Sequence, residues 1–410
     1  MRAQDFGLTK EKIMEIADKY MIHTNDRFSL VAETAKDLEI KDVGGEAYLD
    51  FFAGIAVNSA GNNNEKVVEA IKEQADCILH TSLYPYSVPQ ALLARLICET
   101  LGYQKIFFQN SGTEANEAMI KMARKYGVEN YGEHRYHIVS ARKSFHGRTY
   151  GSLSATGQPD NACQTGLKPM LPGFSYADFN HLESFRNACT EDTIAIMLEP
   201  IQGEAGVYPA TQEFMRGIRR LCDEKKLLLL FDEVQTGWCR TGETMGYMHY
   251  GIKPDIVTMA KGMGGGMPIG AVCTSEKISN VLTGGTHAST YGGNPVCCAA
   301  AYAQINELLK RGLAKNAKYV GDYFMGELKD LPKVREVRGK GLLIAVEFEE
   351  VDAVLLKHVA QHNKLLITAT SENTIRMVPP LIATKADCDN AYSILKASLI
   401  SMEKLEGGSR

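Results

Sequence analysis

Short apolar runs alternate with amphipathic segments through the middle of the chain. Amphipathic helical patterns separate several of these runs; in residues 113–129, Ala115, Met119, Met122 and Tyr126 recur at helical spacing. Strands that alternate with helices predict an α/β fold with a mostly parallel sheet covered on both faces. The six runs with the length of buried strands are 105–108 (KIFF), 137–141 (HIVSA), 193–198 (TIAIML), 226–231 (KLLLLF), 255–260 (DIVTMA) and 269–273 (IGAVC).

The two ends of the chain have a different pattern. The first 54 residues predict a helix and short strands, with a hairpin turn at Gly44 and Gly45. The C-terminal part predicts a long helix from about 296 to 313, strands at 341–348 and 364–368, and a closing helix. Because 410 residues exceed the size at which one core usually stops growing, about 250–300 residues, we expect two domains. These are a large domain over 55–295 and a smaller α+β domain built from 1–54 and 296–410.

Composition and charge exclude several classes of protein. The chain is 45% hydrophobic and 23% charged, with a net charge of −4 and no basic run, so we expect no nucleic-acid partner. No apolar stretch approaches the roughly 20 residues of a membrane span, and the N-terminus lacks the apolar core of a signal peptide. The ten cysteines contain no C-x-x-C pair, which favours buried thiols in a reducing compartment. We therefore expect a cytoplasmic protein with no metal site and no membrane partner.

Small polar residues follow the first predicted strand and begin a helix. They are Ser111, Gly112 and Thr113. Free backbone N–H groups and the helix dipole make such a helix start a site for an anion, best suited to phosphate. The alternative is an ordinary helix cap, because Ser and Thr are common at that position. Both interpretations stay open on this motif alone.

Aromatic, basic and acidic residues follow the next two strands. After 137–141 come Phe145 and His146, which offer flat rings, and Arg148, which is able to bind a carboxylate through two hydrogen bonds. After 193–198 come Glu199, directly at the strand end, and Glu204 in a glycine-rich loop. In open α/β sheets ligands bind at the carboxyl ends of the strands, so these side chains are candidates for one pocket. A surface arginine beside a core ring and acidic helix caps are the structural alternatives.

The ends of the fourth and fifth predicted strands carry a carboxylate and a lysine. Asp232 ends an almost wholly apolar run, where an unpaired carboxylate costs several kcal/mol, so it requires a positive partner or a proton donor. Gln235 adds a hydrogen-bonding group, and Lys261 ends the strand at 255–260, just before a glycine-rich stretch. A phosphate cradle, a flat aromatic face, a buried carboxylate and a lysine at one sheet edge together indicate a pocket for pyridoxal phosphate, with the lysine forming a Schiff base.

The motifs of this region resemble those of the class III, or ω-amino-acid, aminotransferases. They are NSGTEANEA, SFHGRT, EPIQGEAGV, LLFDEVQTGWCRTG, PDIVTMAKGMGGGMPIGAV, STYGGNP and IRMVPPL, and the resemblance runs from about Tyr48 to the C-terminal helix. It implies fold type I, with a seven-stranded sheet in the large domain. It also implies that Lys261 is the Schiff-base lysine and moves a proton during catalysis, together with Asp232 at the pyridine nitrogen. Gln235 is then expected at the ring hydroxyl, with Val234 and Phe145 on the two faces of the ring.

The resemblance also implies the phosphate contacts and an assembly. Gly112 and Thr113 are expected to hold the phosphate, with Ser111, His146 and Glu199 in the same cofactor pocket. Ser289 and Thr290 are expected to reach that phosphate from the neighbouring subunit, which implies a homodimer with shared active sites.

The substrate expectation rests on three further residues. Arg376 is expected to bind the α-carboxylate of glutamate, with Glu204 masking it while the ω-amine is bound, and Arg148 to bind the far carboxylate. The stretch AYLDFFAGIAVN is most similar to members that transfer the δ-amine of N2-acetylornithine to 2-oxoglutarate, a reaction of arginine biosynthesis. Ornithine, 4-aminobutyrate, succinyl-diaminopimelate, putrescine and the aminomutase reaction are alternatives within the family. A non-catalytic partner subunit and a nucleotide-binding regulator are alternatives outside it.

Two stretches depart from the family pattern. Residues 61–66 (GNNNEK) replace its glycine-histidine-x-histidine-proline text, so a substrate-side loop is expected to differ. Residues 25–27 lack the tyrosine with which ornithine aminotransferases hold the α-amino group, which favours the N-acetylated donor.

Overall fold

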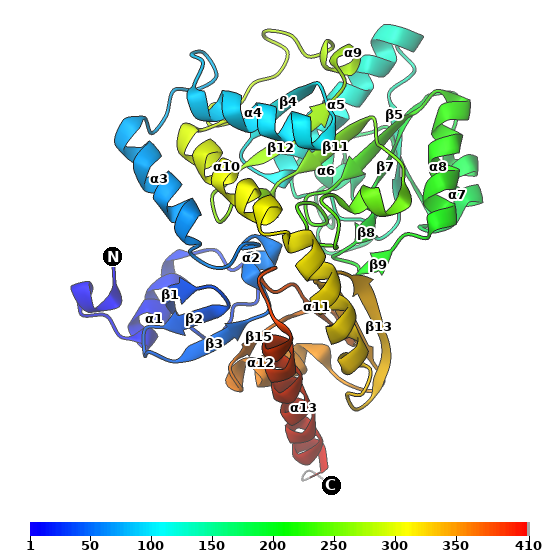
Figure 1. Ribbon diagram of the computed structural model, residues 1–410. Helices are drawn as coiled ribbons and strands as arrows, with labels where there is room; N and C mark the ends of the chain where they lie inside the picture. The colour runs from blue at the N-terminus through cyan, green and yellow to red at the C-terminus, as the bar shows by residue number, and fades with distance from the viewer. Residues whose placement is uncertain (408–410) are drawn as a thin grey trace.

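The centre of the molecule is a seven-stranded sheet, and the computed structural model describes residues 1–407 (Figure 1). The strand order is β4-β12-β11-β10-β7-β5-β6, and β12 alone runs antiparallel to its neighbours. The prediction of a mostly parallel α/β sheet is confirmed. The strands are β4 (Lys105–Gln109), β5 (His137–Ala141), β6 (Phe174–Ala177), β7 (Thr193–Leu198), β10 (Leu228–Asp232), β11 (Ile256–Met259) and β12 (Gly270–Thr274).

Both faces of this sheet are buried, which explains the continuous apolar runs. Successive side chains of a strand point to opposite faces. Leu230 of β10 packs with buried residues of helix α5, whereas its neighbour Phe231 packs with those of helix α8. Burial of each such side chain contributes about 1.5–3 kcal/mol. These and the other helices that accompany the sheet are α5 (Gly112–Tyr131), α8 (Gln212–Lys225), α4 (Val88–Leu101), α6 (Tyr150–Ala155), α7 (Leu182–Ala188) and α9 (Glu276–Ser279).

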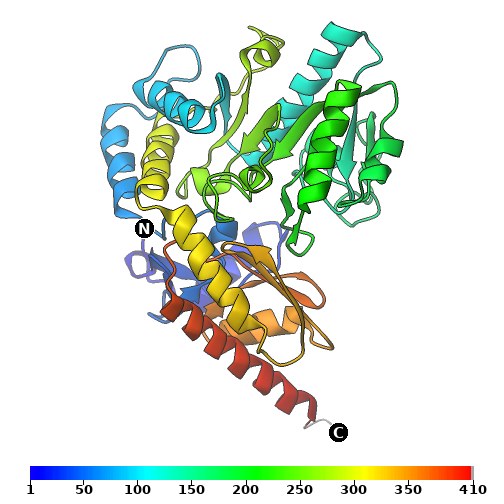
Figure 2. The ribbon, with the colours of Figure 1, turned by 45° about the vertical axis from the view of Figure 1, so that its right-hand side comes forward.

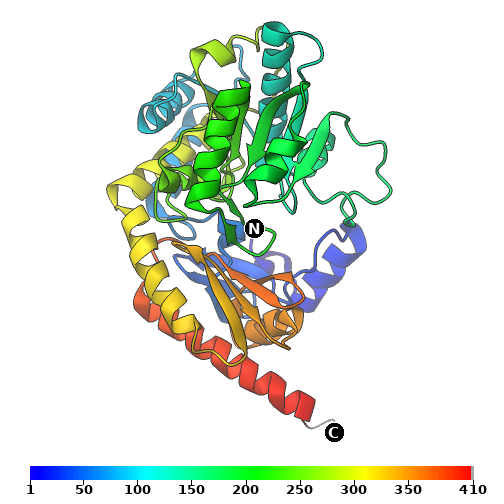
Figure 3. The ribbon, with the colours of Figure 1, turned by 90° about the vertical axis from the view of Figure 1, so that its right-hand side faces the viewer.

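The two ends of the chain meet in a second layer of structure below the large sheet (Figure 3). Strands β2 and β3 form the predicted hairpin, with Gly45 in the left-handed region at φ 82°. The short strand β15 pairs in parallel with β3 and so joins the C-terminal segment to the N-terminal one. This layer contains helix α1 (Lys10–Tyr20) and strands β1 (Ala32–Lys36), β2 (Glu39–Asp42), β3 (Ala47–Asp50) and β15 (Leu365–Leu366).

The rest of the C-terminal segment forms an antiparallel sheet in the order β13-β14-β17-β16, flanked by long helices (Figure 2). The helix predicted from about 296 to 313 ends instead at Lys310, because Gly312 has a left-handed conformation at φ 63°. The division of the domains at residues 54 and 295 stays a prediction. The elements are β13 (Val334–Lys340), β14 (Leu343–Phe348), β16 (Thr368–Ser371), β17 (Thr374–Met377), α10 (Pro295–Lys310), α11 (Leu313–Leu328), α12 (Ala353–His362) and α13 (Lys385–Gly407).

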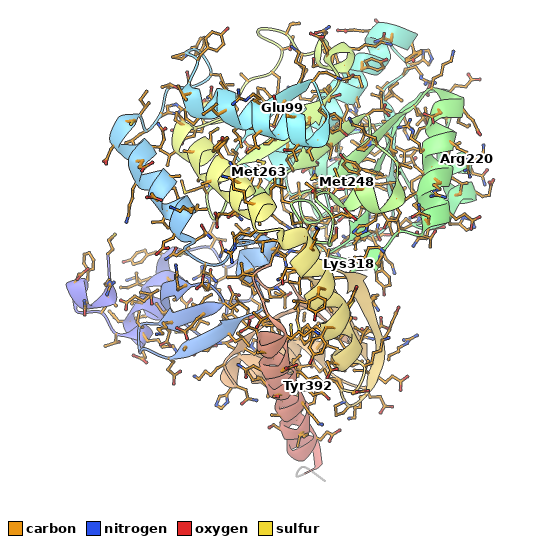
Figure 4. All side chains as sticks on the ribbon, viewed as in Figure 1. Glu99, Arg220, Met248, Met263, Lys318 and Tyr392 are labelled. Atoms are coloured by element: carbon orange, nitrogen blue, oxygen red, sulfur yellow. The ribbon has the colours of Figure 1, made fainter. Side chains whose placement is uncertain are left out.

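Helix α10 covers the segment that follows β11. Met263 lies in the 3-10 helix η3 (Lys261–Met263) and is fully buried, and its side chain is labelled beside α10 in Figure 4. Gln304 of α10 donates a hydrogen bond from Nε2 to the carbonyl of Gly262 at 3.2 Å. The helix therefore fixes the backbone on the C-terminal side of Lys261. The remaining short elements are η1 (Ala3–Phe6), α2 (Ala53–Ala56), α3 (Glu65–Cys77), β8 (Ile201–Gln202), β9 (Tyr208–Pro209) and η2 (Gly246–Tyr250).

The part of the chain that the structure describes contains neither a membrane-spanning helix nor a group of metal ligands. Over residues 1–407 no helix is long and apolar enough to cross a membrane, and among the side chains of residues 1–403 no group of three or more His, Cys, Asp or Glu is placed to hold a metal. His358 and His362 stand four residues apart on α12 without a third ligand. Cysteine burial is less uniform than expected, because Cys77 is exposed and Cys98 and Cys163 are half-buried.

Candidate active site

A cavity of about 470 Å³ opens at the strand ends of the large sheet. It collects residues that lie up to 212 positions apart in the sequence, from Val57 to Ile269, and many of them come together because the carboxyl ends of parallel strands meet at one edge. Among the residues predicted from the sequence, its lining contains Ser111, Gly112, Thr113, Phe145, His146, Arg148, Glu199, Glu204, Asp232, Val234, Gln235 and Lys261.

One wall of the cavity is the N-terminus of α5. Ser111 caps this helix, and its Oγ accepts a hydrogen bond from the backbone N–H of Glu114 at 3.3 Å. The backbone of Gly112 lies against Val234, whose Cγ1 would stand 2.6 Å from a Cβ at that position. The hydroxyl of Thr113 is 2.6 Å from that of Ser152. The start of α5 is thus capped by Ser111 and also lines the cavity, so the interpretation as a helix cap and the interpretation as an anion site are compatible.

Asp232 is the most firmly held carboxylate in the cavity. Its side chain is 5% exposed, and its Oδ2 accepts hydrogen bonds from Nδ1 of His146 at 2.9 Å and from Nδ2 of Asn116 at 2.7 Å. Its Oδ1 accepts one from the backbone N–H of Val234 at 3.0 Å. A carboxylate has about four acceptor positions, and these three donors occupy three of them. Asp232 therefore keeps a position for one more donor.

Glu199 provides a second buried carboxyl group. Its Oε2 accepts a hydrogen bond from the backbone N–H of Phe145 at 3.1 Å. Burial raises the pKa of this carboxyl well above its usual range, and the negative charge of Asp232 raises it further. Glu199 is therefore a proton-holding group that supports the loop of Phe145.

Glu204 and Arg376 form an ion pair at the edge of the cavity. Nη1 of Arg376 donates to Oε1 of Glu204 at 2.6 Å and to Oε1 of Gln235 at 3.1 Å, and Nε2 of Gln235 donates to the same Glu204 oxygen at 2.8 Å. Burial raises the pKa of the Glu204 carboxyl, but the charges of Arg376 and Lys261 outweigh burial and bring it to about 2. Glu204 is accordingly ionised at neutral pH. The Gln235 bridge within this pair was not expected from the sequence.

Lys261 is the first residue of η3, two residues after the end of β11. Its backbone has φ 40°, a left-handed conformation that is costly for a residue with a side chain and that is concentrated at functional sites. Burial lowers the pKa of its ammonium group, although the charge of Glu204 acts in the opposite direction. Of the glycines that follow, Gly264 is needed for the turn itself, because a Cβ there would stand 2.3 Å from the carbonyl oxygen of Met267, and Gly266 lines the cavity.

Other predicted residues lie around the cavity. The guanidinium of Arg148 stands over the ring of Phe145 at 5.3 Å from its centroid. Oγ of Ser289 accepts a hydrogen bond from Nδ2 of the cavity residue Asn110 at 3.2 Å, whereas Thr290 is exposed outside the lining. The roles of Ser289 and Thr290 toward a neighbouring subunit stay a prediction.

Among the lining residues that sequence reasoning missed are Asn116 and Val57. Asn116 stands three residues after Thr113 on α5, so a polar residue one turn from the helix start was the available signal. Val57 follows residues 53–56, which all have positive φ between 48° and 63°. No sequence pattern predicts such a left-handed turn in non-glycine residues. In the divergent stretch 61–66, Asn62 donates to the buried Asp50 at 2.8 Å, and none of the six residues lines the cavity.

The fold and the site together define a fold-type I transferase. The family model "Aminotransferase class-III" matches residues 20–399, and the chain belongs to this family of aminotransferase enzymes. An acetylornithine aminotransferase of Caldanaerobacter subterraneus subsp. tengcongensis is 46% identical over 92% of this chain and 96% of its own length.

Solved structures agree with this assignment. An ornithine aminotransferase from Toxoplasma gondii, described with partial occupancy of PLP at its active site, has a TM-score of 0.92 and 30% identity, with 98% of each chain covered. An acetylornithine aminotransferase from Elizabethkingia anophelis has a TM-score of 0.85 and 29% identity over 96% of this chain and 99% of that one. Class III aminotransferases are dependent on pyridoxal phosphate.

Proposed function

We propose that this enzyme uses pyridoxal phosphate to transfer the δ-amino group of N2-acetylornithine to 2-oxoglutarate. The products are N-acetylglutamate 5-semialdehyde and glutamate. The observation that carries the proposal is the Glu204–Arg376 ion pair at the rim of a cavity that contains Lys261. A site of this kind is able to receive an uncharged end of one substrate and a carboxylate of the next, in alternation.

The cavity residues fit the cofactor by their chemistry. The N–H groups at the start of α5 suit its phosphate, and the free acceptor position of Asp232 suits a protonated ring nitrogen. Phe145, Val234 and Lys261 all line the cavity, which supports the proposal that the two former residues flank the ring and that Lys261 bonds to the aldehyde carbon. When bound, pyridoxal phosphate supplies an electron-accepting ring that carries the amino group from one substrate to the other.

The protein's own contribution to proton transfer falls to Lys261. Because burial lowers the pKa of its ammonium group, the neutral amine is more accessible than in an exposed lysine. Its Nζ would take the proton from the substrate carbon that bears the amine and release it to the carbon on the other side of that nitrogen. Asn116 and His146 hold the Asp232 carboxylate in place during this step.

The ion pair sorts the two substrates by charge. While Glu204 neutralises Arg376, the δ-amine end of the donor enters an electrically balanced pocket. When 2-oxoglutarate arrives, its α-carboxylate replaces Glu204 at Arg376, and Arg148 receives the far carboxylate. Gln235, which touches both partners, is placed to position the guanidinium in either arrangement.

Support for the acylated donor comes from the relatives named for acetylornithine, one of which is 46% identical. Ornithine is the second candidate, because an ornithine aminotransferase has nearly the same backbone at 30% identity. Residues 25–27 provide no tyrosine for a free α-amino group, and Asp26 is engaged with Lys357. This favours the acylated donor.

A panel of ω-amines tests the substrate. Purified enzyme loaded with pyridoxal phosphate is mixed with acetylornithine, ornithine or 4-aminobutyrate, and the loss of cofactor absorbance is followed in single-turnover experiments. We expect the highest ratio of rate to dissociation constant for acetylornithine. A higher ratio for ornithine or 4-aminobutyrate would refute the substrate assignment but leave the aminotransferase chemistry intact.

We further propose a homodimer with shared active sites in the cytoplasm. An exposed apolar surface lies beside Ser289, and contiguous surfaces of this kind mark interfaces. Asn294 donates a hydrogen bond to the carbonyl of Leu79 at 2.8 Å and so ties its two segments together. Light scattering is expected to give twice the mass of the chain. The proposal of a cytoplasmic location is supported by the free cysteines, which suit a reducing compartment. The exposed side chains are Ile78, Leu79, Leu83, Tyr84, Tyr86, Val88 and Tyr291.

A further inference from the structure

A second cavity, of about 380 Å³, lies directly behind Glu204. It is bounded by the loop after β5, by the stretch 157–161 and by Thr370 on β16. Glu204 and Ala205 also line this second cavity, and Glu204 belongs to the lining of both. This carboxylate therefore stands between two open spaces, one on the cofactor side and one on the outer side.

Lys143 faces the outer cavity and is held by its backbone. It has a left-handed conformation at φ 63°, and its N–H donates to the carbonyl of Gly157 at 2.8 Å. Nε2 of Gln158 donates to the carbonyl of Ser144 at 2.8 Å and ties the same two segments together. Among the side chains of residues 1–403, no carboxylate lies within 4.0 Å of Nζ of Lys143. The lysine is an exposed cation without an ion-pair partner there, across a cavity from Glu204.

The proposed exchange of partners at Arg376 leaves Glu204 without a countercharge. Arg376 is the main charge that holds the pKa of the Glu204 carboxyl at about 2 against burial, so a carboxylate that leaves the guanidinium needs another cation to stay ionised, and a second anion at Arg376 repels it. The turn that carries Glu204 links β8 to β9, and Gly206 within it has φ 114°, a conformation that residues with side chains rarely adopt. Asp160 also lines the outer cavity, so a displaced carboxylate needs a cation to enter it.

We propose that Lys143 is the alternate partner of Glu204 and holds its carboxylate in the displaced position. The turn at 203–206 then has two docked states. It docks on Arg376 while the ω-amine is bound, and on Lys143 while the dicarboxylate is bound. This inference rests on the proposed function and adds to it a residue that selects for the keto-acid half of the reaction.

The two half-reactions test the role of Lys143 separately. In Lys143→Gln, the dissociation constant for 2-oxoglutarate in the second half-reaction should rise about two- to fivefold, the range of a partly exposed ion pair. The first half-reaction with the ω-amine should be unchanged, because Glu204 is then on Arg376. Lys143→Arg should restore the 2-oxoglutarate value. Lys329→Gln, which removes an exposed lysine at the end of α11, serves as the matched control.

A double-substitution cycle separates this role from direct substrate binding. When Glu204→Gln has already removed the displaced charge, Lys143→Gln should have no further effect on 2-oxoglutarate. Three results would overturn this inference but not the proposed function. They are an unchanged second half-reaction in Lys143→Gln, an effect of Lys143→Gln that persists in the Glu204→Gln background, and equal weakening of both half-reactions. If the unsubstituted enzyme shows no ω-amine half-reaction, the proposed function itself is refuted, and the inference with it.

Discussion

Replacement of Glu204 by glutamine is the most informative single perturbation of the site. The substitution keeps the size of the side chain but removes its charge, so Arg376, whose side chain is only 4% exposed, loses its countercharge. A buried charge without a partner binds an incoming carboxylate more readily. We therefore expect Glu204→Gln to favour the dicarboxylate substrate over the ω-amine.

The pKa of Glu204 sets the size of this effect. It falls from an ordinary 4.5 to about 2 in the folded chain. About 2.5 units at about 1.36 kcal/mol per unit correspond to about 3 kcal/mol for the ionised carboxylate in its surroundings, or roughly 300-fold. This figure is the net of the attraction by Arg376 and Lys261 and the opposing cost of burial. We expect the preference for glutamate over the ω-amine to rise by between about tenfold and about 300-fold.

Single-turnover half-reactions with each amine measure this preference directly. Glutamate and acetylornithine are mixed in turn with the loaded enzyme, and the ratio of their rate-to-dissociation constants is compared with that of the unsubstituted protein. Glu213→Gln, at an exposed position in the first turn of α8, is the matched control and should leave the ratio unchanged. A ratio within twofold of the unsubstituted enzyme in Glu204→Gln would refute the charge-sorting role of the pair.

Three further substitutions test other parts of the site and fold. Asp232→Ala should leave pyridoxal phosphate bound but lower kcat at least about a hundredfold, because the ring nitrogen loses its countercharge; an unchanged kcat would contradict this role. Gly112→Ala places a Cβ 2.6 Å from Val234 and should lower stability by about 1–3 kcal/mol in denaturant titrations, whereas Gly326→Ala, with open space around it, should be neutral or stabilising. Burial raises the pKa of Glu233 to about 7, so the folded carboxyl keeps a proton that the unfolded chain releases. The free energy of unfolding should therefore fall as pH rises from about 4.5 to about 7, and Glu233→Gln should flatten that slope in thermal unfolding.

The strand ends were predictable because their signal is local. Asp232 is the last residue of one wholly buried strand and Lys261 follows another, and the apolar run before each fixes its position at the sheet edge. Strand β6 escaped prediction because it is a short edge strand whose residues are mostly half-buried, so its pattern is weak.

Residues that depend on distant packing were less accessible to sequence reasoning. Arg376 was expected only from resemblance, because its strand β17 has four residues and its partner Glu204 lies 172 residues away. The bridge by Gln235 depends on Gly203, where a Cβ would stand 2.1 Å from Oε1 of the glutamine. The position of Val57 depends on the left-handed turn before it, which the surrounding structure imposes. Such features arise from tertiary contacts and leave no periodic pattern.

The central claim is that Lys261 bonds to the cofactor, and reductive trapping tests it most directly. The protein is incubated with pyridoxal phosphate, reduced with borohydride, digested and analysed by mass spectrometry. The account predicts a reduced pyridoxyl-phosphate group on the peptide that contains Lys261, and its loss in Lys261→Ala. A label on another lysine, or an unlabelled Lys261 peptide from protein that has bound the cofactor, would contradict it.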